Sequence, residues 1–598
     1  MFFLKKKFYY PLFSLIIGII ISCSIWDFIA LEFKNEEEII GEYSKNLHHS
    51  LNDTLRYIFF ISLPLTLFFI TFFLTKNESH YENISIKLFI TDFNKKYSDR
   101  GNLNNLYFIF FITFLFFISK NFSIGLIDIF ESGISLSGSI LFENGLKPWE
   151  EVYINTGFFY DMFLAKLSWI LTDFKTIGSY VIFKQFLNLL TLIFLIYLFY
   201  IISQSLDNQF TSSNFFLIIS FFLILFVGDA NIWRDLPLIV FLISALKYIN
   251  SKELIWILII SFFCIFTLLW SLDRGFFLIF LSIPFFLLVL INHKIEFIKF
   301  LIIIFLICLF IFLIVENSIL NNFFRHTHDI FVNHEKLNGI IHPKPFSEDQ
   351  NSTRATKSLL IILLNLIISI LIILKKDHFF KYNTKFIFLF FSIMNFISYK
   401  SALSRSDGPH IKEATSFSII LLVCFFLIFL LNYISKNKKI KKNDKKIKLT
   451  YVLIFLFILF NSRDFINIKK IPKNIKELVN ASDEKFLDKD YNKSIRNLSK
   501  FFADEKCLQA FSYDQAIFYL MKKKSCSKFY NVWVIGSKKN QLKYIEELKN
   551  NSPKYLLKGG KINFQNLEER YPYIERHISK NYKFYKKIDT WDIFIKTQ

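Results

Sequence analysis

The sequence predicts a mostly α-helical fold: a polytopic transmembrane helical bundle of about 13 spans followed by a small C-terminal α/β soluble domain. Three observations predict it. The chain has 598 residues, 53% of them hydrophobic, and a mean hydropathy of +0.39. Its charged residues cluster between apolar runs of roughly 20 residues, the length that crosses a bilayer core. After residue 466 these runs stop, and short patterns typical of alternating strands and helices follow.

Each predicted span is an apolar run bounded by polar or charged residues. In order, the spans lie at residues 10–31, 56–75, 105–124, 178–203, 213–229, 236–250, 254–270, 275–292, 297–316, 357–375, 384–402, 413–434 and 449–464. The first run follows Lys5, Lys6 and Lys7, as in a signal peptide. It lacks a small-residue cleavage site, so we interpret it as a retained span.

Lysine-rich loops set the predicted orientation, because cytoplasmic loops carry an excess of Lys and Arg. One alternation places the N-terminus and the lysine-rich loop 435–448 in the cytoplasm. The acidic loop 32–54 and the loop 125–177 then lie outside, together with the C-terminal domain. The sequence thus predicts a multi-pass protein of the bacterial inner (plasma) membrane. Its three predicted parts are two N-terminal spans with a cytoplasmic loop (1–104), a central transmembrane region (105–465) and an outer-face soluble domain (466–598).

Charge placement narrows the function. A net charge of +22 on a soluble protein would indicate nucleic-acid binding, but these lysines lie mainly between spans and no nucleic-acid-binding motif is present. Nearly all polar constellations fall on the predicted outer face. A transporter is expected to place ionisable residues or broken helices near the bilayer midplane. The pattern instead favours an enzyme that acts where lipid meets water, with membrane lipids as its surroundings and no nucleic acid as partner.

Residues 128–151 combine carboxylates, glycines and a proline directly after an apolar run. Nearby, residues 158–175 carry a small or polar stripe at spacings of four, three, four and three. Such a helix, with a shorter one over 131–142, should lie flat in the interface and hold Asp128 and Glu131 at headgroup depth. Either carboxylate is then a candidate general base. The alternative is that Asp128 ends a span and Glu131 caps a helix.

The same loop contains Asp128-x-x-Glu131-x-Gly133, then Gly145-x-x-Pro148-Trp149-x-x-Val152-Tyr153-x-Asn155-x-Gly157. This string resembles the first outer loop of GT-C glycosyltransferases, among them bacterial mannosyl-, arabinosyl- and RgtA-to-D-like members. The resemblance implies transfer of a sugar from a polyprenyl-phosphate donor to a glycan or lipid-linked acceptor, with an acidic residue of this loop as base. The family's usual form is an adjacent Asp-Glu pair. Here Phe130 precedes Glu131, so Asp128 and Glu131 stay alternatives, with Asp128 preferred.

Two charged pairs lie at predicted span ends. Arg234 and Asp235 precede a span: either Asp235 caps its helix, or Arg234 binds a lipid phosphate through its planar fork. Asp273 and Arg274 lie in a predicted tight turn between two spans. They form a local ion pair there, or Asp273 is a second catalytic carboxylate and Arg274 contacts a phosphate. The resemblance implies the latter, because GT-C enzymes often carry a second acidic site in a later outer loop.

Arg405, Asp407 and His410 place a cation, a carboxylate and an imidazole within six residues, beside a turn-forming Gly-Pro. A solvated loop is one interpretation. The other is a substrate site in which Arg405 binds a phosphate or pyrophosphate and His410 contacts the leaving group or the acceptor. Similar Arg-Ser-Asp-x-x-His strings occur in bacterial proteins that resemble GT-C enzymes.

A histidine-rich stretch falls in the predicted outer loop 317–356, at His326, His328 and Asp329. His-x-His is a weak metal spacing without a helical HExxH frame. We therefore expect no metal site and no cofactor. A long loop of this kind is expected to cover the donor pocket.

The C-terminal region predicts a small α/β domain. The predicted strands are Leu508–Phe511, Tyr530–Ile535 and Lys554–Leu557, separated by helices near 513–523 and 540–550, with a hairpin of Tyr582–Ile588 and Trp591–Ile595 at the end. No Gly-rich nucleotide motif is present. The strings Cys507, Ser525-Cys526-Ser527 and Pro553-Lys-Tyr555 resemble the tail domain of many such bacterial enzymes. Cys507 and Cys526 either form a disulfide in an oxidising compartment or stay two buried thiols.

The sequence thus favours a membrane glycosyltransferase of the GT-C type, a hexosyl- or pentosyltransferase acting in the cell envelope. Two alternatives remain. An O-antigen polymerase or ligase also has a large outer loop and uses outer-face Arg and His. A transporter of lipid-linked glycans is favoured less, because the sequence shows no internal repeat and little mid-span charge.

Overall fold

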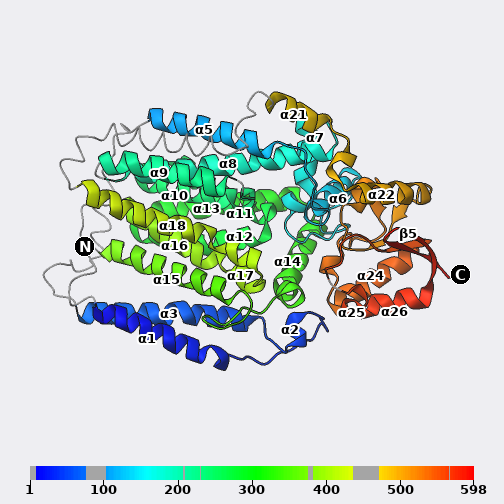
Figure 1. Cartoon of the computed structure of the whole chain (residues 1–598), viewed down its shortest axis with the longest axis horizontal. Helices are drawn as coiled ribbons and strands as arrows, with labels where there is room; N and C mark the ends of the chain where they lie inside the picture. Colours follow the sequence, from blue (N-terminus) through cyan, green and yellow to red (C-terminus); the bar gives the residue numbers. More distant parts are fainter. Residues whose placement is uncertain are drawn as a thin grey trace.

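The computed structural model of the chain describes residues 9–75, 103–206, 209–228, 230–374, 382–435, 471–564 and 566–597. Figure 1 shows a bundle of long helices lying side by side, with a smaller strand-containing domain at one end. The predicted fold class is therefore confirmed. The predicted span 449–464 and the loop 435–448, apart from Ser435, lie outside the described residues.

Twelve helices of the bundle match the first 12 predicted spans in order. They are α1 (Tyr9–Ile25), α3 (Leu51–Leu74), α5 (Leu103–Asn121), α8 (Ile177–Gln204), α9 (Gln209–Val227), α10 (Leu236–Ser251), α11 (Leu254–Trp270), α12 (Leu272–Asn292), α13 (Lys294–Ile314), α15 (Ser352–Leu374), α16 (Tyr382–Ser398) and α18 (Gly408–Ser435). Within the described ranges, nine helices are long and apolar enough to cross a membrane, so this is a multi-pass membrane protein.

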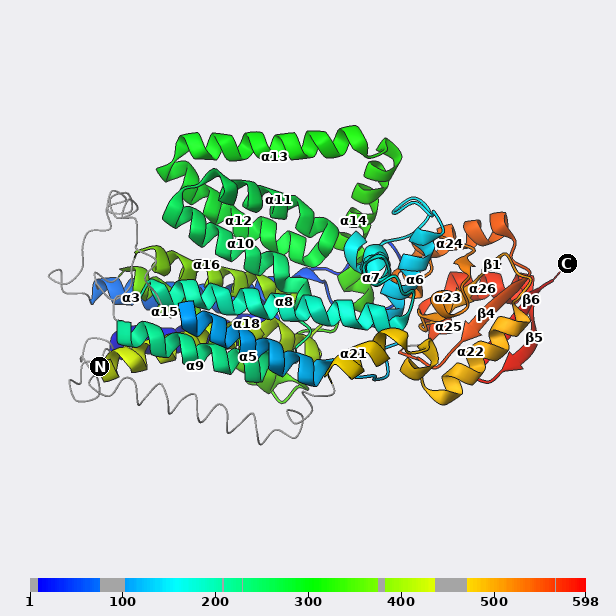
Figure 2. The same cartoon turned by 90° about the horizontal axis from the view of Figure 1, so that it is seen from above.

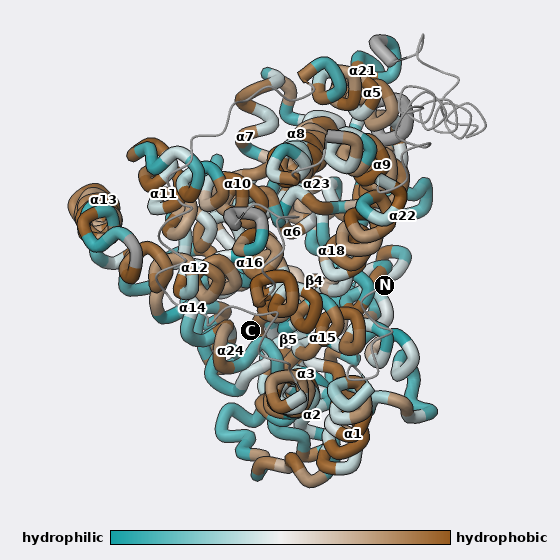
Figure 3. Tube along the Cα trace, turned by 90° about the vertical axis from the view of Figure 1, so that its left-hand side faces the viewer, coloured by the Kyte–Doolittle hydropathy of each residue, from teal (hydrophilic) through white to brown (hydrophobic). Residues whose placement is uncertain are grey.

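Helices are the expected solution for these runs, because a helix satisfies every backbone polar group within its own segment. In Figure 3, which looks along the bundle, much of the tube of the bundle helices is brown, the colour of hydrophobic residues. Helix α13 lies at the edge of the bundle and exposes most of its apolar side chains (Figure 2). One boundary differs from the prediction in a way that matters. Helix α12 begins at Leu272, so Asp273 and Arg274 lie in its first turn and not in a separate turn.

Two short helical elements lie at the end of the bundle next to the C-terminal domain. Helix α6 (Glu131–Glu143) confirms the helix predicted over 131–142. The segment predicted as one helix over 158–175 is a π-helical turn, Phe159–Phe163, continued by α7 (Leu164–Thr172). A helix that lies in the interface is expected to turn its polar stripe toward water along its whole length. This stripe does not, because Asp161 is fully buried. The physical reason is Gly138 of α6, which lacks a side chain and lets the Asp161 carbonyl lie against it.

The predicted long outer loop 317–356 is largely helical. Helix α14 (Asn317–Asn338) runs between the bundle and the C-terminal domain (Figure 1). The expectation of a covering loop was wrong because a partial apolar face was overlooked. Ile319, Phe323 and Ile330 pack against the main core at helical spacing, and the last turn buries Leu337. Only residues 339–351 are irregular.

The N-terminal pair of helices forms a second apolar cluster with α15 and the short helix α17 (Lys400–Ser404). The loop between α1 and α3 contains the four-residue helix α2 (Glu42–Lys45) and reaches the C-terminal domain. There Glu38 pairs with Lys538 and accepts a hydrogen bond from Tyr573. This loop therefore joins the membrane-embedded and soluble parts of the chain.

The C-terminal domain holds a four-stranded sheet in the order β2 (Ala510–Phe511), β4 (Tyr555–Gly559), β6 (Trp591–Lys596) and β5 (Tyr582–Ile588). Strands β2 and β4 are parallel, and the other neighbours are antiparallel. A separate parallel pair joins β1 (Cys507–Leu508) to β3 (Lys524–Ser525). Helices α22 (Lys489–Phe501) and α26 (Pro572–Asn581) contact β5, and α24 (Lys538–Asn551) packs on α26. The predicted hairpin is confirmed.

The predicted strand Tyr530–Ile535 is wrong. The segment carries a short 3-10 turn, Val532–Val534, because the Asn531 side chain accepts a hydrogen bond from the Trp533 N–H. That local bond competes with a sheet ladder. The predicted helix over 513–523 is reduced to α23 (Ile517–Leu520). The turn places Trp533 against the membrane-embedded part, and this matters for the site below.

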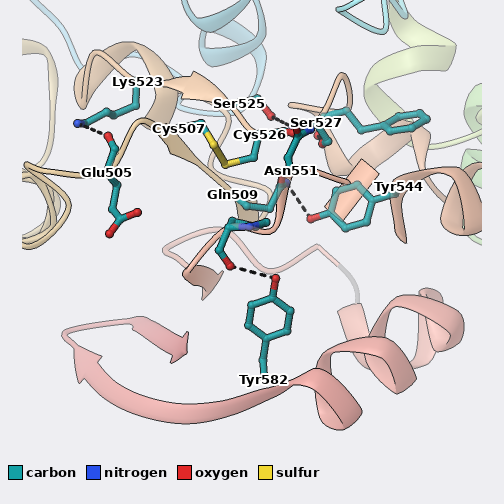
Figure 4. Close-up of a disulfide and its surroundings, with 12 residues drawn as sticks. Glu505, Cys507, Gln509, Lys523, Ser525, Cys526, Ser527, Tyr544, Asn551 and Tyr582 are labelled. Carbon is teal, nitrogen blue, oxygen red and sulfur yellow. Dashed lines mark hydrogen bonds between the residues drawn. A yellow bond between two sulfur atoms is a disulfide. The ribbon is translucent and has the colours of Figure 1, made fainter. Parts of the chain in front are cut away.

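Cys507 and Cys526 form a disulfide that ties β1 to the residue after β3 (Figure 4). The Asn551 amide donates to the Cys526 carbonyl at 2.6 Å, which holds the bridge against the end of α24. The pairing that the sequence left open is therefore present in the structure.

We expect a thiol count to show this bridge. The chain has six cysteines, and four of them, Cys23, Cys264, Cys308 and Cys424, are free. Denatured protein prepared under non-reducing conditions should label at four thiols, and reduced protein at six. In the Cys507→Ser variant the non-reduced count should rise to five. A count of six in the non-reduced wild type would contradict the pairing.

Candidate active site

Four of the charged constellations noted in the sequence come together at the end of the bundle that faces the C-terminal domain (Figure 1). They arrive from the start of α6, the turn before α10, the first turn of α12 and the segment that leads into α18. Each lies at the beginning of a helix. Span ends are where polar side chains can reach water while the helix stays in lipid.

Arg234 and Asp273 form the first pair, with Nη2 of Arg234 at 2.8 Å from Oδ1 of Asp273. Ser271 lies between them. Its hydroxyl accepts from Nε and Nη2 of Arg234 at 3.2 and 2.9 Å and donates to Asp273 at 2.5 Å. Asp273 is thus held by Arg234 from a neighbouring element as well as by Ser271 of its own turn. This arrangement is compatible both with a structural ion pair and with a catalytic role of Asp273.

Arg274 is the hub of a buried charge cluster. Its Nε donates to Asp235 at 2.8 Å, its Nη1 to Asp273 at 2.5 Å and its Nη2 to Glu413 at 3.2 Å. The Asp235 carboxylate accepts a hydrogen bond from Arg274 and none from the backbone of α10. It is therefore not a side-chain cap of α10, which was one of the two interpretations of the sequence. Pro237 does lie in the first turn of α10, as expected.

Asp407 holds Arg405 and His410 side by side. One carboxylate oxygen accepts from Nε of Arg405 at 3.0 Å, and the other accepts from Nδ1 of His410 at 2.6 Å and from its backbone N–H at 3.0 Å. Partial burial raises the pKa of Asp407, but the His410 hydrogen bonds and the Arg405 charge outweigh it and lower the pKa below its usual range. Both Nη groups of Arg405 and Nε2 of His410 have no hydrogen-bond partner among the described residues.

Glu131 joins the first pair through an aromatic side chain. The Tyr160 hydroxyl donates to Oε2 of Glu131 at 3.1 Å, and the Arg234 guanidinium lies over the Tyr160 ring, 5.5 Å from its centre. Asp128 does a different task. Its Oδ1 accepts from the N–H groups of Phe130 and Glu131 at 2.8 and 3.1 Å and so caps α6.

Trp533 of the C-terminal domain connects Phe130, the neighbour of Glu131, to Arg405. Its ring contacts Phe130 edge-on at 5.6 Å, directly beside Glu131. The Arg405 guanidinium lies 5.6 Å from the centre of the same ring. The soluble domain therefore contributes to the site, and the 3-10 turn that replaced the predicted strand is the element that brings Trp533 there.

These contacts link a set of side chains, which we call the outer ring; between His410 and Glu413 the connection is helix α18 itself, which carries both residues. Its members are Phe130, Glu131, Tyr160, Arg234, Asp235, Ser271, Asp273, Arg274, Arg405, Asp407, His410, Glu413 and Trp533. Five carboxylates face three guanidiniums, so the ring has an excess of negative charge when its histidine is neutral. No group of three potential metal ligands is present in the part of the chain that the structure describes.

His334 of α14 lies next to the outer ring; in the sequence it stood out only as part of the histidine pattern that follows His326, which is a weak metal spacing. Burial and the charges of Arg405, Arg570 and His410 lower its pKa to about 4, while Asp273 acts in the opposite direction. It is therefore neutral at pH 7. Glu413, Tyr160 and Trp533 were also missed. Only Glu413 carried a usable signal, since it lies one helical turn after His410.

The histidine-rich stretch of α14 has a structural role. Asp329 accepts from the Tyr153 hydroxyl at 2.5 Å and from the Asn540 amide at 2.9 Å. His326 stacks on Tyr153 with ring centres 4.3 Å apart. These contacts fasten the segment around Tyr153, α14 and the C-terminal domain together.

Asp161, beneath α6, gives a pH-dependent prediction. Its Oδ2 accepts from the N–H groups of Asn155 and Thr156, yet complete burial dominates and raises its pKa to about 6. The folded state thus holds this proton more tightly than the unfolded state, whose ordinary pKa is about 3.9. Stability from this group is present at low pH and is lost as pH rises from about 4 to 6.

We expect Asp161→Asn to flatten that part of the stability–pH curve, because the amide keeps one acceptor oxygen and carries no charge. The free energy of unfolding at pH 7 should be equal to or higher than that of the wild type. Asp161→Leu removes the acceptor and should destabilise by about 1–3 kcal/mol. Thermal unfolding at several pH values checks both, and an unchanged pH profile in Asp161→Asn would refute the assignment.

Comparisons with known proteins show that the fold of this chain is similar to that of solved structures. No protein-family model matches the chain, and no curated protein matches it in sequence. In structure it is similar to ArnT from Cupriavidus metallidurans bound to undecaprenyl phosphate, with 10% identity, coverage of 83% of this chain and 98% of that chain, and a TM-score of 0.42. It is also similar to the archaeal oligosaccharyltransferase AglB from Archaeoglobus fulgidus in complex with an inhibitory peptide and a dolichol-phosphate. There the identity is 10%, the coverage 82% of this chain and 74% of that chain, and the TM-score 0.38. The similarity assigns no reaction to this chain.

Proposed function

We propose that this chain is a membrane glycosyltransferase of the GT-C type. It transfers a hexose or pentose from a polyprenyl-phosphate donor to a cell-envelope acceptor at the outer face of the membrane. One observation carries the proposal. At the end of a transmembrane bundle the outer ring holds the Glu131 carboxylate and the Arg405 guanidinium, and among the described residues one oxygen of Glu131 and both Nη groups of Arg405 have no hydrogen-bond partner. A base and a phosphate-binding fork are the two groups that such a transfer needs.

Glu131 is the proposed general base. Tyr160 occupies its Oε2, which leaves Oε1 without a partner in the described part of the chain. The acceptor hydroxyl gives its proton to Oε1 while its oxygen forms the new bond to the anomeric carbon. The bond from that carbon to the donor phosphate oxygen breaks, and polyprenyl phosphate leaves with the electron pair. Attack from the side opposite the leaving group inverts the anomeric centre.

Asp128 is not our choice, although it was preferred on sequence. Its Oδ1 accepts from two backbone N–H groups of α6, and within the described residues no side chain of the outer ring forms a hydrogen bond with it, whereas Glu131 contacts Tyr160 of that ring. Asp273, the other candidate catalytic carboxylate, is shared between Arg234 and Arg274. A carboxylate with two guanidinium partners is a weak base. We assign Asp273 to positioning Arg234, which in turn lies against Tyr160.

Arg405 is the proposed ligand of the donor phosphate. Asp407 holds its Nε, so the two Nη groups are oriented for a bidentate contact. Arg234 and Arg274 are already engaged by carboxylates, and His410 stands beside Arg405 on the same Asp407 carboxylate. We expect His410 to hydrogen-bond the leaving phosphate or the acceptor through Nε2.

The Arg405→Lys variant tests this assignment. Lysine keeps the charge but loses the planar fork, so we expect the KM for the donor to rise about 10–100-fold, with a smaller change in kcat. Steady-state kinetics with purified enzyme in detergent measure both constants. Arg496→Lys, on an exposed arginine of the C-terminal domain paired with Glu484, is the matched control. An unchanged donor KM in Arg405→Lys rules out this role.

The function itself is tested by comparing surface glycans and lipid-linked sugar pools in cells that make wild type, Glu131→Gln or no protein, at matched expression. We expect the deletion and Glu131→Gln to lose the same sugar and to accumulate the same unused polyprenyl-phosphate sugar. The free Nε2 of His410 beside Arg405 favours an O-antigen polymerase or ligase as the second candidate. That class predicts accumulation of complete lipid-linked glycan instead.

A further inference from the structure

A pocket of about 380 Å³ lies between the loop that joins α1 to α3 and the short helix α25 (Leu567–Arg570) of the C-terminal domain. It is outside the outer ring. Its lining residues are Ile40, Gly41, Glu42, Lys45, Asn46, Asn566, Glu569 and Arg570. The volume is within the range of small-ligand sites. Most of its lining is polar or charged, so the pocket suits a hydrophilic ligand better than a lipid chain.

Arg570 is the group that points to a ligand. Its residue surface is only 2% exposed, and Nη2 donates to the Leu337 carbonyl at 2.9 Å and to Asn338 at 2.6 Å. Its Nε and Nη1 make no hydrogen bond, and no carboxylate pairs with it among the described residues. A buried cation without a counter-ion costs free energy, and since Nε and Nη1 are themselves buried, an anion in the adjoining pocket supplies the missing counter-charge through the field of the guanidinium.

The other charges of the pocket can accommodate such an anion. Lys45 pairs with Glu569, but both side chains are more than half exposed, so this ion pair is weak and exchangeable. Lys45 is therefore able to turn toward a ligand. Glu42 is held in place through one oxygen, Oε1, which accepts from the Ile341 N–H at 3.0 Å. The amides of Asn46 and Asn566 each keep a group without a partner in the described structure, as sugar hydroxyls require.

The pocket is connected to the outer ring by one aromatic side chain. The Arg570 guanidinium lies 4.9 Å from the centre of the Trp533 ring, and Arg405 contacts that same ring. A ligand held at Arg570 is thus one side chain away from the proposed phosphate ligand. The pocket is lined by the loop that carries α2 and by the segment that carries α25, and these two helices lie at the end of the bundle next to the C-terminal domain (Figure 1).

We propose that this pocket binds an anionic saccharide, a sugar unit that carries a carboxylate or a phosphate. Arg570 and Lys45 take the charge, and Asn46 and Asn566 take hydroxyl groups. Calling the ligand part of the acceptor rests on the proposed function, whereas the binding itself does not. The acceptor would then be held by an acidic unit while another of its hydroxyls reaches Glu131.

Binding to purified full-length protein in detergent tests this without any donor. The probes are glucuronic acid, glucose 6-phosphate and neutral glucose, measured by titration calorimetry. We expect one of the two anionic probes to bind with a Kd in the millimolar range, and neutral glucose at least about tenfold more weakly. Whichever anion binds names the source of the charge.

Two variants avoid the docking role of Arg570. Lys45→Gln should weaken anion binding about tenfold, and Asn46→Trp should abolish it by filling the pocket. Arg496→Gln, which breaks an exposed ion pair elsewhere on the C-terminal domain, should bind as the wild type does. Equal binding of glucose and both anions, wild-type binding in both variants, or no binding of any probe overturns the proposal. If the anion does not bind but Glu131→Gln is inactive in sugar transfer, the pocket proposal is refuted and the proposed glycosyltransferase function stands.

Discussion

Replacing Glu131 with glutamine is expected to lower kcat for sugar transfer by about 10²–10⁴-fold, the range that general bases contribute. Glutamine keeps an oxygen that accepts from Tyr160, so the start of α6 and its contact with the Arg234–Tyr160 pair should be preserved. What it loses is the ability to take a proton. The effect should therefore fall on kcat and leave the KM for the donor within a few fold.

Asp128→Asn is the matched control, because it removes the same charge three residues away. The asparagine oxygen can still accept from the Phe130 and Glu131 N–H groups, so the cap of α6 is retained. We expect a loss of less than about tenfold. If instead Asp128→Asn is inactive and Glu131→Gln is active, the base is Asp128 and the preference drawn from the sequence is correct.

The second large effect concerns stability. Arg274→Met is expected to cost about 3–5 kcal/mol, because it removes one cation from three carboxylates and leaves Asp235 buried without its partner. The Arg274 side chain is 8% exposed, so water does not compensate for the loss. The midpoint of thermal unfolding in detergent should fall by several degrees, with activity lost in parallel.

Lys299→Met provides the comparison for that variant. Lys299 also precedes an apolar stretch and pairs with Glu296 at 2.8 Å, but its side chain is about half exposed. A surface pair of this kind contributes at most about 1 kcal/mol. A fall as large as that of Arg274→Met in Lys299→Met, or no fall in either variant, would show that the charge cluster is not a structural hub.

Spans were predictable because lipid imposes one local rule on every segment: about 20 apolar residues in a helix. The rule depends on composition alone, so 12 predicted spans have their helices in order. The same rule placed the charged side chains next to span ends, although Asp273 and Arg274 lie inside the first turn of α12 and not in the predicted turn before it. The terminal hairpin followed from an equally local signal, the short turn between two alternating strands.

Segments outside the lipid followed no such rule. The stretch that contains α14 is polar on one side, and its composition predicts a loop, since its apolar residues are few and acquire a partner only in the folded protein. Val532–Val534 has the composition of a strand, yet Asn531 and the packing of Trp533 make it a turn. In both places tertiary contacts outweigh local propensity.

The sequence by itself determined a multi-pass helical protein with a C-terminal α/β domain, and it singled out Asp128, which lies outside the outer ring, and most polar residues of that ring: Glu131, Arg234, Asp235, Asp273, Arg274, Arg405, Asp407 and His410. Tertiary structure alone decided how these residues are joined. It separated Glu131 from Asp128, brought Glu413 to Arg274 and introduced Trp533 from the other domain. The physical reason is distance along the chain. Hydropathy and helix signals act over a few residues, whereas the direction and partner of a carboxylate depend on groups hundreds of residues away.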